Sequence, residues 1–381
     1  AFDKLFYGNG QEVHFKKRGS IRSLQGYSRT NKSGGTEIVF RGEYVEWKGI
    51  KAKIKFDRAN AYETEMLKKR VKYCRILRKT GRHKIRWYVQ LMLEGKPVVK
   101  LDKDTGKPKH PIGNGAVGID IGPQTIAYVA QTEAVLMELA DGVKNIDRER
   151  RLIQRKMDRS RRATNPACYR PDGTFIKGTR PKIKSKRYLK LQQEKRFLEY
   201  QQAEIRKRQH TELANHLLSL GDRFYVEDMS WPALTKRAKK TEISEKTGRY
   251  KRKKRFGKSV GKKAPAMLIS LLQQKLKSRG YDSDIKVPTS LRASRYNHLS
   301  GDFEKKTLNQ RWNDMPDGRR IQRDLYSAFL LQHVNESKDG YDERALKRDY
   351  ESFVILHDEM IEKLRKMPKT IASMGINRTA S

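Results

Sequence analysis

Three acidic residues lie where a carboxylate is costly unless it has a specific role. Asp120 lies inside the apolar stretch VGIDIG, Glu227 ends the apolar stretch FYVE, and Asp324 opens the apolar helix pattern DLYSAFLL. A charge among apolar neighbours is destabilising unless it is hydrogen-bonded, paired or bound to a cation. Carboxylate oxygens suit Mg²⁺ or Mn²⁺, and two such ions about 3.5–4 Å apart would activate water and stabilise the leaving oxygen of a phosphodiester. We therefore predict these acids as metal ligands and catalytic residues.

Each acid also has a simpler explanation. Asp120 could hydrogen-bond the turn before Gly122. Glu227, or its neighbour Asp228, could pair with an arginine or lysine. Asp324 could be an acid that the helix dipole favours at a helix start. Because the three acids lie far apart in the sequence, only the fold can bring them together as one site.

The charge of the chain indicates a polyanionic partner. Its 381 residues include 86 basic and 44 acidic side chains, and the net charge is +42. Such an excess repels itself unless a polyanion lies against it, and nucleic acid is the obvious one. The alternatives are a basic protein that is merely soluble or a binder of membrane surfaces, but the charge is spread over several separate blocks. The 36% hydrophobic residues suffice for a real core.

Cysteine content argues against disulfides and zinc. The chain has two cysteines, Cys74 and Cys168, and no CxxC pair. A disulfide framework is therefore not expected, a reducing interior is the natural compartment, and a thiolate zinc ribbon is excluded. No apolar run of about 18 residues predicts a membrane span, and no signal-peptide pattern is present.

The first part of the chain, residues 1–113, is predicted to be rich in strands. Residues 37–56 and 84–95 alternate apolar and polar side chains in short runs with glycine-containing breaks. This pattern is typical of an antiparallel, barrel-like module. A linker rich in proline and glycine follows at 101–114.

The rest of the chain mixes strand and helix patterns, which predicts an α/β fold. Short apolar runs indicate strands, and longer runs with helical spacing or terminal proline and glycine indicate helices. The expected strands are 116–121, 125–131, 134–139, 222–228 and 283–288. The expected helices are 145–161, 183–220, 264–280, 323–334 and a polar one from Gly340 to about Arg365.

Clusters of basic residues are the candidate contacts to nucleic acid. One tract runs from Lys251 to Lys263 directly after the second acidic motif, and it could also be a localisation signal or a solvated loop. Arg323 could touch the scissile phosphate or pair with a neighbouring acid. The nucleic-acid-binding candidates are Arg159, Arg161, Arg162, Lys251, Arg252, Lys253, Lys254, Arg255, Lys258 and Arg323.

The ordered motifs resemble those of transposon-encoded TnpB proteins and type V CRISPR effectors, over about residues 35–335. GIDIGPQTIAYVA is similar to their first RuvC motif, FYVED to the second and IQRDLYSAFLL to the third. GIDIG alone also occurs in sugar kinases and actin-like ATPases, so the ordered set in a basic chain carries the resemblance. It implies an RNase H-like (RuvC) nuclease domain, with a wedge-like β-rich domain before it and long basic helices.

The resemblance also implies an order of domains. Such proteins normally have a helical recognition domain inserted near their start. The sequence shows none here, so this domain could be absent, disordered or lost upstream. The implied parts are a wedge-like nucleic-acid-binding domain at 1–113, a nuclease core at 114–288 with a helical insertion at 145–220, a target-loading lobe at 289–322, the third motif and its helix at 323–335, and a polar helical tail at 336–381.

One departure from the family lies in the lobe at 289–322. The family usually carries a four-cysteine zinc ribbon there, whereas this region has no cysteine. His298 is expected to be a surface or core residue and not a ligand. The lobe is therefore expected to be free of zinc and held by Tyr296, Phe303, Leu308 and Trp312.

The function that the resemblance implies is RNA-guided cleavage of DNA. Asp120, Glu227 and Asp324 would hold two Mg²⁺ or Mn²⁺ ions, a structured guide RNA would select the target in double-stranded DNA, and the protein would read a short flanking motif. The expected location is the cytoplasm of a prokaryote, close to its DNA. Two alternatives stay open: an RNA-guided DNA binder with an idle nuclease, and an unguided, structure-specific RuvC-type nuclease.

Overall fold

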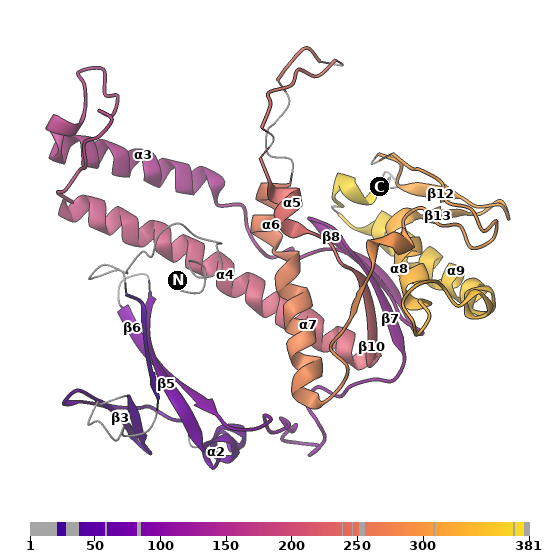
Figure 1. The fold of residues 1–381 in the computed structure, drawn as a ribbon, viewed down its shortest axis with the longest axis horizontal. Coiled ribbons are helices and arrows are strands. Elements are labelled where there is room, and N and C mark those ends of the chain that lie inside the picture. Colours follow the sequence, from indigo (N-terminus) through magenta and orange to yellow (C-terminus); the bar gives the residue numbers. More distant parts are fainter. Residues whose placement is uncertain are drawn as a thin grey trace. The chain divides into compact units, whose positions relative to one another are not determined.

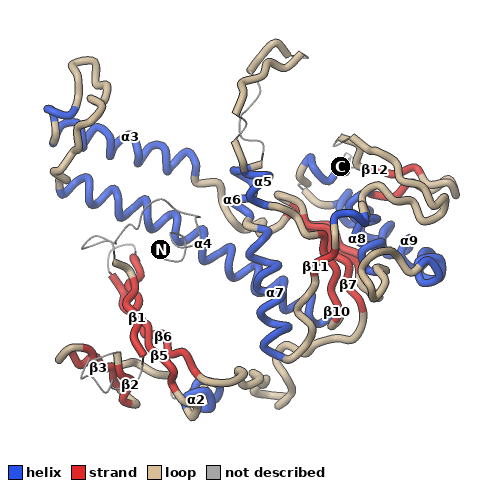
Figure 2. The backbone as a smooth tube through the Cα atoms, in the orientation of Figure 1, coloured by secondary structure: helices blue, strands red, loops and turns tan. Residues whose placement is uncertain are grey.

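The computed structural model describes most of the chain, and the chain divides into two compact units. Unit 1 comprises residues 1–107 and 146–201, and unit 2 comprises 108–145 and 202–381. Figure 1 and Figure 2 show the elements of both units. The described residues are 21–27, 38–57, 59–81, 85–237, 239–245, 247–250, 256–307, 309–368 and 370–376.

The strands of unit 1 form two small antiparallel sheets within the described residues. The first sheet has the order β1-β5-β6 and the second the order β2-β3-β4. Ile38, Val45 and Cys74 are buried together between strands of both sheets. The antiparallel, β-rich prediction is therefore confirmed, while closure into a barrel stays a prediction. The elements are β1 (Ser23–Tyr27), β2 (Val39–Arg41), β3 (Tyr44–Trp47), β4 (Ile50–Lys53), α2 (Ala61–Leu67), β5 (Val71–Thr80) and β6 (Ile85–Leu93).

Two long helices complete unit 1. Helix α3 (Asp147–Thr164) and helix α4 (Lys186–Leu220) agree with the predicted helices to within a few residues, and α4 continues into unit 2. The loop between them contains the short helix η1 (Pro166–Cys168). The buried Asn165 side chain closes this loop, since it donates to the Ile183 carbonyl (2.9 Å) and accepts from the Ile183 amide (3.0 Å).

Unit 2 is built on a mixed sheet, five-stranded within the described residues, so the α/β prediction is confirmed. The strand order is β11-β10-β7-β8-β9, in which β7, β8 and β9 are antiparallel and β10 and β11 run parallel to β7. Every residue of β8 is buried, which explains its continuous apolar sequence. The strands are β7 (Ala116–Ile121), β8 (Thr125–Val129), β9 (Ala134–Glu138), β10 (Arg223–Glu227) and β11 (Lys286–Val287).

Helices cover both faces of this sheet. Val117, Ile119 and Ile121 pack with the last turns of α4 and with α7 (Pro265–Arg279). Side chains alternate between the faces of a strand, so Gly118 and Asp120 face the opposite side, which α8 (Arg323–Gln332) covers. Helix α7 begins with Pro265 and ends before Gly280 in the left-handed conformation, as its sequence predicts.

Among the remaining elements of unit 2, β13 and α9 pack against α8. The predicted polar helix forms as α9, but one of its faces lies in the core with Tyr350, Phe353 and Leu364 buried. No helix among the described residues is long and apolar enough to cross a membrane. These elements are α5 (Trp231–Thr235), α6 (Gly257–Lys263), η2 (Thr289–Leu291), β12 (Trp312–Asp314), β13 (Arg320–Gln322), α9 (Glu343–Lys366) and η3 (Ala372–Met374).

Lys263, at the end of the basic tract, is a structural residue, and the expectation that it contacts nucleic acid is wrong. Its side chain is 3% exposed, and its ammonium group lies 2.6 Å from a carboxylate oxygen of Glu138 and 3.0 Å from the Ala140 carbonyl oxygen. A lysine buried in this way is tolerated because it is paired.

We expect Lys263→Met to lower the free energy of unfolding by about 2 kcal/mol, because it leaves the Glu138 carboxylate and the Ala140 carbonyl without their donor. Urea unfolding followed by circular dichroism measures the change. The double variant Lys263→Met/Glu138→Gln should recover part of the loss. A single variant as stable as the wild type would show that the pair does not stabilise the fold.

Candidate active site

Asp120 lies near the end of β7, on the face that α8 covers. Gly118 precedes it on the same face, and a Cβ there would lie 2.0 Å from the Ala328 carbonyl oxygen and 2.2 Å from the Gln332 amide nitrogen. The backbone of α8 therefore rests directly on β7. This close contact brings Ser327 to Asp120, and its hydroxyl hydrogen-bonds the carboxylate.

Glu227 lies beside Asp120 at the same end of the sheet. Strand β10 runs parallel to β7 with Val226 opposite Ile119. The residues that follow them, Glu227 and Asp120, are therefore neighbours across the two strands. A Glu227 carboxylate oxygen accepts a hydrogen bond from the backbone amide of Ala293 (3.2 Å). The acids of two neighbouring strands are thus brought together, as the sequence predicts.

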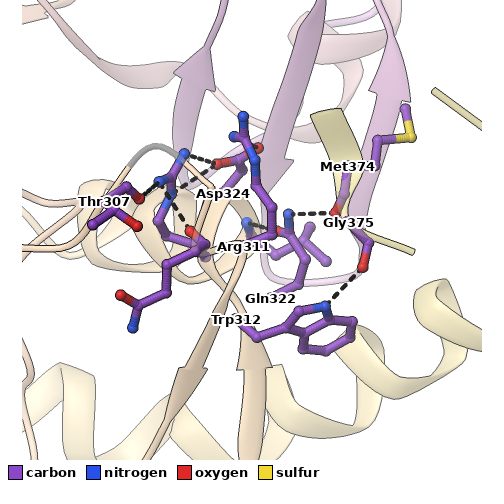
Figure 3. Close-up of polar contacts among 10 residues, drawn as sticks. Thr307, Arg311, Trp312, Gln322, Asp324, Met374 and Gly375 are labelled. Atoms are coloured by element: carbon purple, nitrogen blue, oxygen red, sulfur yellow. Dashed lines mark hydrogen bonds and ion pairs between the residues drawn. The ribbon is translucent and has the colours of Figure 1, made fainter. Parts of the chain in front are cut away.

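Asp324 reaches the site from the first turn of α8. The side chain of Gln322 caps this helix by accepting from the Leu325 amide (2.8 Å). The Asp324 side chain is 12% exposed, and Arg323 lies 3.3 Å and Arg311 3.9 Å from its carboxylate oxygens. Figure 3 shows Arg311 and Asp324 side by side. The fold therefore joins all three predicted acids, with arginines as counter-charges.

The charges of Asp324 and Glu227 both act on the Asp120 carboxyl group. Burial, and then the charges of Asp324 and Glu227, raise the pKa of Asp120 from 3.8 to about 8, against smaller opposing effects of Ser327 and Arg323. Burial also raises the pKa of Glu227. Ionisation of all three carboxyl groups is therefore unfavourable in the metal-free site, and a bound cation would favour it.

The donor set fits a hard divalent cation, although the described residues hold no ready-made cluster. No group of three histidine, cysteine or acidic side chains among them has a spacing that would hold a metal ion. The three acids supply only oxygen donors, as Mg²⁺ and Mn²⁺ prefer. Asp324 is held by arginines, so its oxygens would have to exchange these partners for a cation.

The raised pKa of Asp120 makes the stability of the metal-free protein depend on pH. The folded state binds this proton more tightly than the unfolded state, so the free energy of unfolding falls as pH rises from about 4 to about 8. We expect the metal-free wild type to lose stability over this range relative to an Asp120→Asn variant. Thermal unfolding of both proteins in EDTA at several pH values measures the difference; parallel curves would contradict the expected proton binding.

The arginine candidates differ in accessibility. Arg159 and Arg162 are exposed on α3, and Arg161, next to them, pairs with Asp158 (2.9 Å). Arg323 is 13% exposed and donates to the Gln310 carbonyl (3.1 Å) as well as to Asp324. Of the two alternatives for Arg323, the structure thus shows the one in which Arg323 pairs with a neighbouring acid, Asp324.

The candidates of the basic tract are only partly described. Lys258, in α6, has an exposed side chain. The others lie outside the described residues; they are Lys251, Arg252, Lys253, Lys254 and Arg255.

The lobe at 289–322 is held by aromatic contacts with the C-terminal elements. Tyr296 stacks on Tyr341 with ring centroids 4.9 Å apart and meets the tilted ring of Phe303 at 5.0 Å. The Trp312 indole nitrogen donates to the Gly375 carbonyl (2.8 Å). Leu308 lies outside the described residues. The aromatic side chains Tyr296 and Trp312 therefore join the lobe to the C-terminal elements, as the sequence predicts.

His298 is a core residue, which is one of the two alternatives that the sequence left open. It is 3% exposed, its Nδ1 lies 2.7 Å from the Tyr326 hydroxyl, and burial lowers its pKa to about 4.

Sequence reasoning missed the groups that hold Asp120 and Asp324 in place: Ser327 at Asp120, and Arg311 and Gln322 at Asp324 and its helix. Arg311 lies in a loop with no pattern that marks it, and Ser327 is one of many polar residues in helices. Gln322 is held by two hydrogen bonds. Its backbone N–H donates to the His357 ring nitrogen Nε2 (2.9 Å), and its side-chain NH₂ group donates to the Met374 carbonyl (3.2 Å). Only the N-cap position of Gln322, before the helix pattern, could have been inferred from the sequence.

Comparison with known proteins gives no family assignment. No protein-family model and no curated protein matches the chain. Among solved structures, the chain is similar to the "Cryo-EM structure of CRISPR-Cas12f Ternary Complex", with 12% sequence identity and a TM-score of 0.30. The similarity covers 81% of this chain and 58% of that one, so the chain spans less than two thirds of that protein's length. A TM-score this low gives no support for a shared function.

Proposed function

We propose that this protein is an RNA-guided DNA endonuclease of the TnpB and type V CRISPR kind, with its chemistry at Asp120, Glu227 and Asp324. The observation that carries the proposal is the meeting of three sequence-distant acids whose charges act on one another. Perturbed carboxylates of this kind are typical of functional sites. The ordered RuvC-like motifs around them give the reaction class.

The sheet of unit 2 supports an RNase H-like assignment of the nuclease domain. Its antiparallel strands β7, β8 and β9 continue beyond β7 into the parallel strands β10 and β11, with helices on both faces. We expect this arrangement for an RNase H-like domain. The first acid then lies on the central strand, the second on its parallel neighbour and the third on the covering helix.

The acids would hold two divalent cations, Mg²⁺ or Mn²⁺, at this end of the sheet. Asp120 and Glu227 face the site from adjacent strands, and Asp324 would join them after leaving Arg311 and Arg323. The cations would supply an activated water and stabilise the leaving oxygen. Ser327 orients Asp120, the Ala293 amide orients Glu227, and the arginines keep positive charge near the phosphate. No zinc is proposed.

The partners that we propose are a structured guide RNA and double-stranded target DNA. The net charge of +42 and the exposed arginines of α3 support a polyanionic partner. The wedge-like role of residues 1–113, the target-loading role of 289–322 and the flanking motif belong to the same proposal. Retention of all three acids favours an active enzyme over an idle RNA-guided binder.

Sequencing the RNA that co-purifies with the full chain, and then testing cleavage of a matching DNA duplex with Mg²⁺, tests the proposal. One abundant structured RNA and cleavage at the matching site are the expected results. Defined RNA without cleavage would indicate the idle binder. Cleavage without defined RNA would indicate an unguided RuvC-type nuclease.

A further inference from the structure

A pocket of about 650 Å³ lies between β12, β13 and the segment that contains η3. Arg311, Trp312 and Arg320 line it from one side, and Ser373 and Gly375 line it from the other. Its volume lies within the range of small-molecule sites, roughly 300–1,000 Å³. A packing void in a hydrophobic core is lined by apolar side chains, whereas arginines around one aromatic side chain are typical of nucleotide recognition.

Trp312 is held in this pocket as a preformed platform. Its indole nitrogen donates to the Gly375 carbonyl (2.8 Å), as Figure 3 shows, and its ring meets the ring of His357 edge-on at 6.2 Å. The guanidinium of Arg320 lies over the indole, 5.6 Å from the ring centroid, and because the Arg320 side chain is largely exposed, a base that stacks on the indole would displace it from the ring. A fixed aromatic side chain loses little freedom when a base stacks on it, and every base offers a π-face.

The polar groups of the pocket suit a phosphate. Arg311 and Arg320 outnumber the one acidic lining residue, Asp314, whose carboxylate lies 3.4 Å from Arg320 and is largely exposed. The Ser373 hydroxyl has no hydrogen-bond partner among the described residues. The pocket therefore offers two guanidinium groups and a hydroxyl to an anion.

Arg311 links this pocket to the carboxylate site. It lines the pocket and also lies 3.9 Å from Asp324. A phosphate on Arg311 would lie one side chain away from Asp324, and it would compete with that carboxylate for the guanidinium. Filling of the pocket and release of Asp324 would then be coupled.

We propose that this pocket binds one unpaired nucleotide of the DNA strand to be cut, with its base on Trp312 and its phosphate on Arg311 and Arg320. The inference rests on the proposed nuclease function, for which it names a substrate subsite. Occupancy of the pocket places the next phosphodiester toward Asp324. Double-stranded DNA does not fill the pocket, because a paired and stacked base cannot lie on Trp312.

Photocrosslinking of the full chain in EDTA tests the pocket without cleavage. The probe is a single-stranded oligothymidylate of about ten nucleotides that carries 5-iodo-deoxyuridine, and mass spectrometry identifies the crosslinked peptides. We expect Trp312 to be the main tryptophan crosslinked, although Trp87 is far more exposed, at 64%. The competing tryptophans are Trp47, Trp87 and Trp231.

Variants and competitors complete the test. Arg320→Gln, at a largely exposed side chain, should lower the Trp312 crosslink roughly fivefold, whereas Arg348→Gln, at an exposed arginine on α9, should not. Crosslinks at other residues but not at Trp312, or equal yields of the Trp312 crosslink in both variants, would overturn the proposal that this pocket binds a nucleotide. A stronger Trp312 crosslink with the matching RNA probe would overturn the assignment to DNA. If the protein crosslinks through Trp312 but does not cut DNA in the cleavage assay, the pocket proposal stands and the proposed nuclease function is wrong.

Discussion

Replacing Asp120 with asparagine is expected to abolish DNA cleavage and, at the same time, to stabilise the metal-free protein. The substitution keeps the shape of the side chain but removes a carboxyl group that must either take up a proton or carry a charge that burial, Asp324 and Glu227 disfavour when the metal-free protein folds. We expect the cleavage rate to fall about 10³-fold or more and the melting temperature in EDTA to rise by roughly 2–4 °C. Opposite effects on activity and stability are typical of a functional site.

Cleavage of guide-matched DNA and thermal unfolding of the same preparations measure both effects. Asp228→Asn is the matched control, because Asp228 follows Glu227 but is 55% exposed and paired with Lys286 (2.6 Å). The control should cleave DNA like the wild type. Full activity of Asp120→Asn would remove Asp120 from the reaction.

Replacing Gly118 with alanine is expected to damage both the fold and the site. The new Cβ would lie 2.0 Å from the Ala328 carbonyl oxygen, and the backbone of α8 would have to move away from β7. We expect a loss of about 3 kcal/mol or more in the free energy of unfolding. Since α8 carries Asp324, a shift of about 1 Å would also lower cleavage about 10²-fold.

Urea unfolding and cleavage by the soluble fraction check this prediction. Gly261→Ala is the matched control, because nothing lies within 4 Å of a Cβ at that helical glycine. It should be as stable as the wild type or slightly more stable. If Gly118→Ala unfolds like the wild type and cuts DNA, then the contact between β7 and α8 does not position Asp324.

The strands and helices of unit 2 were largely predictable because their signals are local. The alternation and apolar content of β7 and β10, and the proline and glycine at the ends of α7, depend on short stretches of sequence. The three acids were predictable as well, since each interrupts or borders an apolar run. That Asp120 and Glu227 lie side by side depends on the register between β7 and β10, which cannot be inferred from the sequence.

The groups around the acids were not predictable, because they come from contacts between distant segments. Arg311 gains its role only when its loop lies against α8, and Gln322 only when α9 and η3 pack beside it. The buried face of α9 was missed because its charged residues dominate its composition. Lys263 likewise looks like part of a solvated basic tract until the fold buries it against Glu138.

The most direct test of the central claim is a Mn²⁺ titration of the full chain, with free Mn²⁺ followed by electron paramagnetic resonance. The account predicts saturable binding that strengthens as pH rises toward 8, because the raised pKa of Asp120 means that the cation must displace a proton. It also predicts that Asp120→Asn loses this binding while Asp228→Asn keeps it. Equal Mn²⁺ binding by the wild type and Asp120→Asn would contradict a cation site at Asp120, Glu227 and Asp324.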